Sequence, residues 1–548
     1  MQTNFYALVP LIAPLLLYGL AAALLLKWQK PGRLSIELIG WIGIFISLVS
    51  GALYYFNGPS QSALLGYAEL GFSLRMDPLS LTMLVMIALL GFVVLKFSIN
   101  YLDGDERQHI FIARLATTIA SVELLVLSGN VLQILVFWIF TSICLHYLLI
   151  FYKKRPQAVA AARKKLIMAR IGDLSLLAAF ILLYIQFQTG NLESIFAQAS
   201  ALESMNSSLT AATILLVITA VLKSAQFPTH GWLIEVVETP TPVSALLHAG
   251  LLNAGPFLMV RMAFLMNMSE PASLLLIFIG GFTAMIASVV FLTQPTIKVA
   301  LGYSSVAHMG FMLLICGFGV YTAAILHLVA HSFYKAHAFL SSGSVIDMVK
   351  ARRVTLPSRT GSIFRILASI GISMFIYLLF SIAWGIKVDE EFALMATGAI
   401  IVMGLSQIIA PALDSTGGFK GVLKSAWLAF MVALAFFSLE KGAHYLLHSQ
   451  IPSQYELSLV VKGAVISILV LFALVVLLQL IAPKLKKGSF AYNLGIHLRN
   501  GLYANVIFDR YIGALKKDKF KWANLTVKED KKKEYEAAEL KPSLESNR

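Results

Sequence analysis

The stretch LKSAQFPTHGWLIEVVETPTPVSALLHAG, residues 222–250, decides how this chain can fold. An apolar segment ends at Lys223, and Pro228 then removes a backbone donor, which predicts a broken or kinked helix. Pro240 suits the start of the next helix, which would carry His248 inward. Broken helices at membrane depth line cavities and form ion sites, so Lys223 is a candidate proton-binding residue. The alternative is a lysine that extends from a helix end to the membrane surface.

The composition is that of a membrane protein. Of the 548 residues, 58% are hydrophobic and 13% are charged, and the mean hydropathy is +0.79. Apolar runs of about 20 residues, enough to cross a bilayer as a helix, recur along the chain and lack the alternating polarity of barrel strands. We therefore predict an all-α polytopic membrane protein with about fifteen transmembrane helices. They are expected at residues 5–26, 34–56, 77–100, 111–128, 130–152, 166–188, 209–237, 241–267, 272–292, 298–317, 321–349, 363–384, 392–411, 422–440 and 458–482.

The loops predict the orientation in the membrane. Lys and Arg gather in alternate loops, at residues 27–33, 153–165, 350–359 and 484–487, whereas residues 189–208 contain no basic residue. Basic loops face the cytoplasm, so we expect a multi-pass protein of the cell inner membrane with its N-terminus outside and its C-terminus cytoplasmic. The first apolar run lacks the basic residues with which a secretory signal begins, so we expect it to be a membrane helix rather than a cleaved signal peptide. The net charge of +15 then reflects topology and anionic lipid, without a nucleic acid partner.

A second polar stretch, HLVAHSFYKAH at residues 327–337, lies within an apolar run. On a helix, His327, His331 and Lys335 fall within an arc of about 80°, whereas His337 points elsewhere. Such a row can pass protons along a helix through intervening waters. Histidines that bond to a neighbouring helix are the structural alternative. A metal site is a further alternative, since His-x-x-x-His has ligand spacing, but the Glu of a zinc-protease motif is missing.

Single ionisable residues interrupt other apolar runs. Glu123 lies within one run, Lys298 opens another, and Asp173 follows Arg170 at a spacing that allows an ion pair. We expect Glu123 and Lys298 to take part in ion transfer, whereas for Asp173 a structural ion pair is an equal alternative.

The cysteines and the tail suggest no chemistry of their own. Cys144 and Cys316 lie within apolar runs, so neither a disulfide framework nor a cysteine metal site is available, and we expect packing roles. The charge-dense tail from Lys516 predicts a solvated end, with a docking strip for a cytoplasmic partner as the alternative.

These motifs resemble a known family. The run KSAQFP-x-H-x-WL with E-x-PTPVSAL-x-HA after it is similar to the antiporter-like subunits of respiratory complex I and of multisubunit Na+/H+ antiporters, particularly the NuoL type. RMDPLS at 75–80, RIGD at 170–173 and IKVALGYS at 297–304 are further matches, and the resemblance covers roughly residues 70–350. It implies two inverted five-helix repeats, each with a broken helix, and a chain of Lys, His and Glu residues that carries protons.

The resemblance also implies roles and boundaries. Lys223 would match the broken-helix lysine, His248 the histidine of the next helix, and His327, His331 and Lys335 the central relay. The regions would be N-terminal helices at 1–110, the first repeat at 111–267, a diverged second repeat at 268–411, C-terminal helices at 412–482 and a basic cytoplasmic tail at 483–548.

Two features depart from the family pattern. Members carry Trp-Glu in the fifth helix, where the Glu pairs with the broken-helix lysine, whereas here Ile139 follows Trp138. Glu123, one helix earlier, is our hypothetical substitute for that acid. The motif of the second broken helix is unrecognisable after residue 360, where Arg365 and Asp414 are the nearest candidates.

A closer resemblance is to DabB, the membrane subunit of bacterial inorganic-carbon accumulation complexes. It is carried by HGWL at 230–233, ETPTP at 238–242, LLHAG at 246–250 and RNGLY at 499–503. It implies a transporter subunit without a cofactor of its own, and a cytoplasmic zinc-containing partner, DabA, similar to β-carbonic anhydrases. Flow of protons, or alternatively of Na+, through this chain would energise the hydration of CO2 to bicarbonate.

Two other functions are alternatives. The first is an ion-pumping subunit of a complex I-like or multisubunit Na+/H+ antiporter complex. The second, an integral membrane oxidase or desaturase, would need several histidine-rich boxes near one membrane face, and the scatter of the eleven histidines argues against it.

Overall fold

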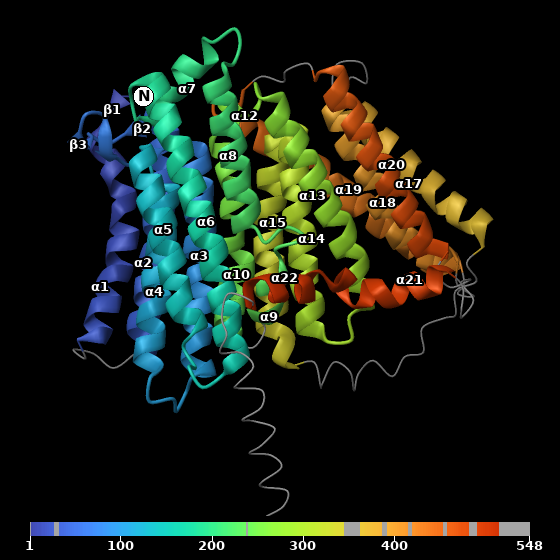
Figure 1. Ribbon diagram of the computed structural model, residues 1–548, viewed down its shortest axis with the longest axis horizontal. Helices are drawn as coiled ribbons and strands as arrows, with labels where there is room; N and C mark the ends of the chain where they lie inside the picture. The colour runs from blue at the N-terminus through green and yellow to red at the C-terminus, as the bar shows by residue number, and fades with distance from the viewer. Residues whose placement is uncertain are drawn as a thin grey trace, which may run out of the picture. The chain divides into compact units, whose positions relative to one another are not determined.

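The structure is a computed structural model that describes residues 2–26, 32–236, 239–344, 362–385, 392–414, 419–452, 457–481 and 490–513, and these are mostly helical (Figure 1). The long helices are α1 (Ile12–Leu25), α2 (Arg33–Asn57), α3 (Pro78–Tyr101), α4 (Gln108–Val126), α5 (Val131–Leu149), α6 (Pro156–Phe187), α8 (Ser207–Lys223), α13 (Glu270–Thr293), α14 (Ile297–Gly317), α15 (Tyr321–Leu340), α17 (Ile363–Trp384), α18 (Phe392–Leu413), α19 (Phe419–Leu447) and α20 (Leu459–Ile481). The shorter ones are α7 (Leu192–Ser200), α9 (Gly231–Glu235), α10 (Thr241–Ala249), α11 (Ala254–Arg261), α12 (Ala263–Met266), α21 (Phe490–Arg499) and α22 (Ala504–Gly513).

Within the described residues, thirteen helical segments are long and apolar enough to cross a membrane. The chain is therefore an all-α polytopic membrane protein, but the predicted count of fifteen is not confirmed. The other two predicted segments are helical as well: α8 has only 17 residues, and α15 carries the row of histidines and a lysine. The histidines and the lysine lower the mean hydropathy of α15, although other helices of the bundle pack around it.

The start of α6 corrects the predicted loop at residues 153–165. The helix begins at Pro156 rather than at residue 166, because proline at the first helical positions is already set for the helical backbone. Lys164 and Lys165, which the loop count placed among exposed basic residues, are buried within this helix. They therefore belong to the packed interior rather than to the basic loop.

Short strands lie at one end of the helices, beside the N-terminus (Figure 1), and the sequence did not predict them. β2 (Ser60–Gln61) pairs in parallel with β1 (Gln2–Thr3) and antiparallel with β5 (Arg75–Met76). A separate hairpin joins β3 (Leu65–Tyr67) to β4 (Leu70–Phe72). Because β5 leads directly into α3, this pairing fixes the residues that begin α3 at that end of the bundle.

The chain divides into two compact units, Met1–Leu502 and Tyr503–Arg548. The described part of the second unit is Tyr503 and α22. The tail from Lys516 and the basic clusters at 350–359 and 484–487 lie outside the described residues. The region boundaries proposed from the resemblance stay predictions.

α13 and α14 are packed at very short range through glycines. A Cβ atom on Gly280 would lie 2.7 Å from the carbonyl oxygen of Gly310 and 2.7 Å from the backbone nitrogen of Leu314. Small residues permit such close approach of backbones in membrane helices. The contact matters for function because α14 carries part of the histidine cluster described below.

We expect Gly280→Ala to destabilise the protein by roughly 1–3 kcal/mol, because backbone atoms cannot yield to the added methyl group as a side chain can. Thermal unfolding in detergent, followed by size-exclusion chromatography, measures this effect. Gly371→Ala on α17, where a Cβ meets open space, is the matched control and should be neutral or slightly stabilising. Equal unfolding temperatures for the two variants would contradict the account of this crossing.

Candidate functional site

The predicted break after Lys223 is confirmed. α8 ends at Lys223, residues 224–230 form turns, and the helix resumes as α9 at Gly231. The ammonium group of Lys223 therefore lies at the end of a half-helix, inside the bundle.

An aromatic side chain lies beside Lys223. The ammonium nitrogen lies 4.4 Å from the centre of the Trp138 ring and donates a hydrogen bond of 3.3 Å to the Trp138 carbonyl oxygen. A cation over an indole face is stabilised by about 0.5–2 kcal/mol, depending on how far it is desolvated. Trp138 thus supplies part of the stabilisation that the missing carboxylate at Ile139 would have given.

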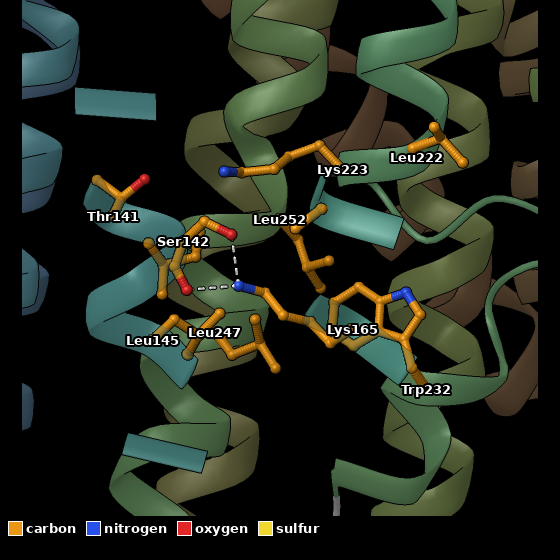
Figure 2. Close-up of a pocket in the computed structure, with 11 residues that line it drawn as sticks. Thr141, Ser142, Leu145, Lys165, Leu222, Lys223, Trp232, Leu247 and Leu252 are labelled. Atoms are coloured by element: carbon orange, nitrogen blue, oxygen red, sulfur yellow. Dashed lines mark hydrogen bonds between the residues drawn. The ribbon is translucent and has the colours of Figure 1, made fainter. Parts of the chain in front are cut away.

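Two small cavities meet at Lys223. One, of about 20 Å³, is bounded by α5, α6 and α9 and also touches Lys165 and Trp232 (Figure 2). The other, also of about 20 Å³, lies toward α3 and α4 and reaches Gly250. Each has room for a water molecule. Lys223 therefore lines both cavities, as do Thr141 and Leu251, and it is the ionisable residue of the three.

Asp173 is the predicted acid that lies near Lys223. It lies on α6, is buried, and forms an ion pair of 2.7 Å with Arg170, which is one of the two alternatives that the sequence left open. It also interacts electrostatically with Lys223. The carboxylate is thus shared between a nearby guanidinium and the lysine at the helix break.

The structure does not bring Glu123 to Lys223, contrary to the hypothesis of a substitute acid. Glu123 is buried and lines a different cavity, with Leu17 of α1, Gly40 of α2 and Phe92 of α3. The neighbouring Val122 faces the cavity of Lys223 instead, because successive helical residues point about 100° apart. A part for Glu123 in ion transfer stays a prediction.

The row on α15 is confirmed, and it includes one residue that the sequence did not reveal. His331 and Lys335 are buried on one face, whereas His337 is exposed. His327 Nε2 lies 2.8 Å from Nδ1 of His308 on α14, whose ring centre is 4.8 Å from that of His331. His308 escaped prediction because it is a single histidine in its helix, and only tertiary packing brings it to the row.

Lys335 and His248 extend this cluster toward the helix break. Lys335 is fully buried, and its ammonium group donates a hydrogen bond of 3.1 Å to the carbonyl oxygen of Leu301. His248 is stacked on Phe339 at 4.3 Å between ring centres and interacts electrostatically with Lys335. Within the described residues, neither ring nitrogen of His248 has a hydrogen-bond partner. An unpartnered buried imidazole is able to accept or release a proton.

The helix that carries His248 is itself interrupted, whereas the sequence predicted one helix over 241–267. α10 ends at Ala249, Leu251–Asn253 forms a 3-10 turn, and α11 starts at Ala254. Gly250, which lacks a side chain, adopts a non-helical conformation at the interruption. The side chain of Asn253 then donates a hydrogen bond of 2.7 Å to Ser332 of α15. This second break opens beside the cavity that reaches Lys223.

Lys298 lies apart from the histidine cluster. It is partly exposed near the start of α14, and its ammonium group is 3.4 Å from the hydroxyl of Thr241, which begins α10. Its nearest link to the row is Leu301, one helical turn away, which accepts from Lys335. Lys298 is thus placed at one end of the bundle, and its role stays a prediction.

The second half of the chain shows no broken helix within the residues that the structure describes. α17 runs uninterrupted from Ile363 to Trp384, with Arg365 exposed near its start. Asp414 accepts a hydrogen bond of 3.0 Å from the backbone N–H of Ser362, which precedes α17. These two candidates therefore lie near the end of a helix rather than at a break within it.

Comparison with known proteins places the chain in a family. Residues 128–386 match the family model described as NADH:quinone oxidoreductase/Mrp antiporter, and residues 64–112 match that of the N-terminus of complex I chain 5. A probable inorganic carbon transporter subunit, DabB2 of Halothiobacillus neapolitanus, is 37% identical over 82% of this chain and 81% of the relative. A probable subunit DabB of Hydrogenovibrio crunogenus is 32% identical over 77% and 85%. The chain belongs to the DabB family of inorganic carbon transporter subunits.

The fold of this DabB-family chain is shared with antiporters. A chain of the Mrp complex from Dietzia sp. DQ12-45-1b superimposes with a TM-score of 0.60 at 24% identity, over 94% of this chain and 61% of that chain. The relatives are membrane subunits of larger complexes rather than enzymes. Among the described residues, no three His, Cys, Asp or Glu side chains come together as a metal site.

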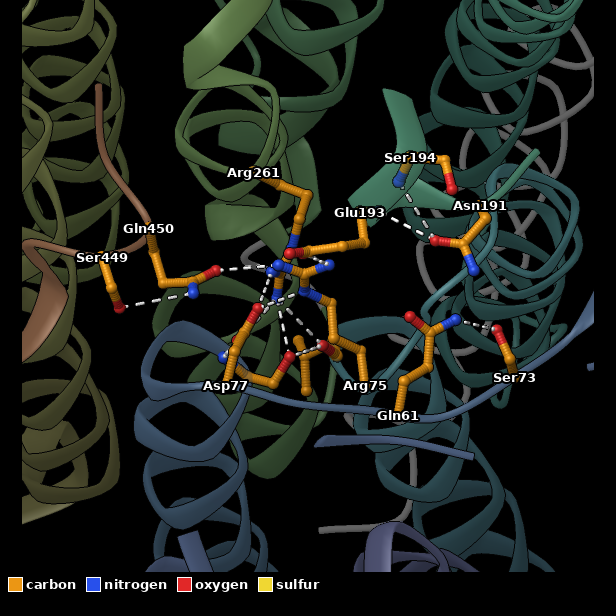
Figure 3. Close-up of polar contacts among 12 residues, drawn as sticks. Gln61, Ser73, Arg75, Asp77, Asn191, Glu193, Ser194, Arg261, Ser449 and Gln450 are labelled. Carbon is orange, nitrogen blue, oxygen red and sulfur yellow. Dashed lines mark hydrogen bonds and ion pairs between the residues drawn. The ribbon is translucent and has the colours of Figure 1, made fainter. Parts of the chain in front are cut away.

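A buried ion-pair network closes the end of the bundle that carries the strands (Figure 3). Asp77 caps α3 and forms ion pairs of 2.5 Å with both Arg75 and Arg261. Arg75 also reaches Glu193 of α7 at 2.8 Å and Gln450 at 3.0 Å. One carboxylate therefore connects β5, α3 and α11, and through Arg75 also α7 and the segment that follows α19.

The charge of Asp77 is held by its partners. Burial alone would raise the pKa of its carboxyl, but the guanidinium groups of Arg261 and Arg75 outweigh burial and keep the pKa well below its usual range. A depressed folded pKa means that the stabilisation is complete above the unfolded pKa of about 4 and is lost as the pH falls through the folded value.

We expect Asp77→Asn to cost about 3–5 kcal/mol of stability, because it leaves two buried guanidinium groups without a counter-charge. The difference from the unaltered protein should be constant from about pH 8 to pH 5 and shrink only in stronger acid. Thermal unfolding across that range measures it, with the exposed Asp103→Asn as control. An Asp77→Asn variant as stable as the control would sink the idea of a network that holds this end together.

Proposed function

We propose that this chain conducts protons across the membrane and that their flow energises inorganic carbon accumulation. The observation that carries the proposal is the row of ionisable groups inside the bundle. It runs from Asp173 and Lys223, past the cavity at Gly250, to His248 and Lys335, and it ends in the cluster of His308, His327 and His331. Buried ionisable residues in membrane helices mark ion or proton paths.

The chemistry of the row favours protons over Na+. Its central members are nitrogen bases, and Na+ in transporters is coordinated by oxygen atoms such as unwound backbone carbonyls. Histidine exchanges protons near neutral pH, and waters in the cavities complete the gaps between side chains. A histidine pair at 2.8 Å can pass a proton directly from one ring to the other.

A partner would perform the carbon chemistry. The names of the relatives support a place in inorganic carbon transport, and resemblance to that branch implies a DabA-like cytoplasmic zinc subunit similar to β-carbonic anhydrase. In the proposed orientation the N-terminus is outside the inner membrane and the C-terminus is cytoplasmic. A proton that moves inward across about 100 mV releases roughly 2.3 kcal/mol, so one or two could bias hydration of CO2 toward bicarbonate.

The second candidate function is ion pumping in an antiporter or complex I-like assembly. The Mrp fold similarity favours it. Two observations weigh against it. Ile139 stands where the resemblance implies an acid that pairs with the broken-helix lysine, and α17 is uninterrupted within the described residues.

Lys335→Ala should lower inorganic carbon uptake at least tenfold, because it removes the buried proton carrier between His248 and the histidine cluster. Uptake of labelled bicarbonate by cells that depend on the complex is the measurement, together with a check that the complex assembles. His337→Ala, two residues along the same helix on its exposed side, is the control and should retain uptake. Normal uptake by Lys335→Ala would remove this residue from the path.

The partner can be identified directly. When the full chain is tagged at its N-terminus and solubilised gently, we expect a single large soluble protein that contains zinc to co-purify. Mass spectrometry and metal analysis identify it. Several small hydrophobic subunits, or flavin and iron-sulfur proteins, would instead support the pumping alternative.

A further inference from the structure

The cavity beside Lys223 contains a second lysine that neither the sequence nor the proposed row included. Lys165 of α6 is buried, and its ammonium group donates hydrogen bonds of 2.7 Å to both the carbonyl oxygen and the hydroxyl of Ser142 on α5 (Figure 2). Both of these acceptors are neutral. Lys165 is therefore held in a fixed position without a direct counter-charge from Ser142.

Lys165 and Lys223 line the same cavity of about 20 Å³ and interact electrostatically. In Figure 2 both side chains extend toward the segment of α5 that carries Thr141 and Ser142. Two like charges in a desolvated space repel strongly, and Asp173, the acid that interacts with both lysines, is already paired with Arg170. A proton on one lysine therefore disfavours a proton on the other.

A water molecule in this cavity could bridge the ammonium groups of Lys165 and Lys223. Its volume is sufficient for one water molecule, and it needs polar partners to hold that water. The two lysines and the hydroxyl groups of Thr141 and Ser142 supply such partners. A water held by these groups would bridge Lys165 to Lys223.

Lys165 also lies toward the end of α5 at which protons moving inward would leave. His146 is one helical turn beyond Ser142, toward the end of α5 at Leu149, and it interacts electrostatically with Lys165. Nδ1 of His146 has no hydrogen-bond partner in the described structure. The loop just after α5 carries Lys153 and Arg155, which belong to a predicted cytoplasmic cluster. Lys165 and His146 thus form steps from Lys223 to that side.

We propose that Lys165 is a proton carrier that exchanges protons with Lys223 through the water in their shared cavity. The proposal rests on the proton conduction proposed above. When Lys223 is charged and Lys165 neutral, one N–H bond of Lys223 breaks as the water gains that proton, and the water gives another proton to the Lys165 nitrogen. The next proton to reach Lys223, through the second cavity at Gly250, repels the one on Lys165 and favours its release toward His146.

Proton flux through the purified full chain in liposomes tests this inference, with a pH-sensitive dye inside and a potassium diffusion potential as the driving force. Lys165→Met should lower the flux at least tenfold, because it keeps the shape of the side chain but carries no proton. Lys165→Arg should be equally slow, since it keeps the charge and the hydrogen bonds to Ser142 but does not release its proton. Arg163→Met, which removes an exposed charge from the same helix, is the control and should be unchanged.

The outcomes separate the possible roles. Flux within twofold of the unaltered protein in Lys165→Met would overturn the inference, as would full flux in Lys165→Arg, which would show that Lys165 only positions Ser142. Thermal unfolding verifies that each variant is folded. If Lys165→Met does not fold, the proton flux of Lys165→Arg is the test of the inference. Absence of flux in both the unaltered protein and Arg163→Met would overturn proton conduction itself, and this inference with it.

Discussion

A positive charge held at membrane depth is the constraint on which the rest of this structure depends. An unpaired lysine at the centre of a membrane helix costs about 2.5–3.5 kcal/mol on insertion scales. Three features of the structure reduce this cost at Lys223. The helix ends there, the Trp138 ring lies against the ammonium group, and two cavities with room for water adjoin it. Each feature stabilises the charged form while leaving a route for the proton to depart.

The contact of Lys223 with Trp138, an aromatic ring rather than an acid, affects how readily the lysine releases its proton. A carboxylate stays charged after a proton leaves and attracts it back, whereas the attraction of an indole ring is directed only at the cation. The nearest acid, Asp173, is already engaged by Arg170. We infer that the site is arranged for passage of protons down their gradient rather than for storage and controlled release.

The sequence predicted the features that depend on local chemistry. Pro228 marked the helix break because it removes a backbone donor, and the spacing of His327, His331 and Lys335 placed them on one face. Features that depend on packing between helices were missed. His308 meets the row only because α14 packs on α15, and the break at Gly250 was hidden within an apolar run.

Charge counting and helix spacing also have limits. The sequence places Lys165 in a basic loop because Pro156 and the charges around it are typical of a loop, whereas α6 begins at Pro156 and Lys165 is buried within it. Glu123 was paired with Lys223 on its position in the neighbouring helix, and only the rotation of α4 shows that it faces α1 and α2 instead. In both cases the orientation of a helix about its axis decided the environment of an ionisable side chain.

The central claim is that protons cross the membrane through this chain. Its most direct test is the current carried by the purified full chain, with its co-purifying partner, in a planar bilayer under separate gradients of H+ and Na+. The account predicts a current whose reversal potential follows the H+ gradient and which vanishes in Lys223→Met. A reversal potential that follows Na+, or a current that persists unchanged in Lys223→Met, would contradict it.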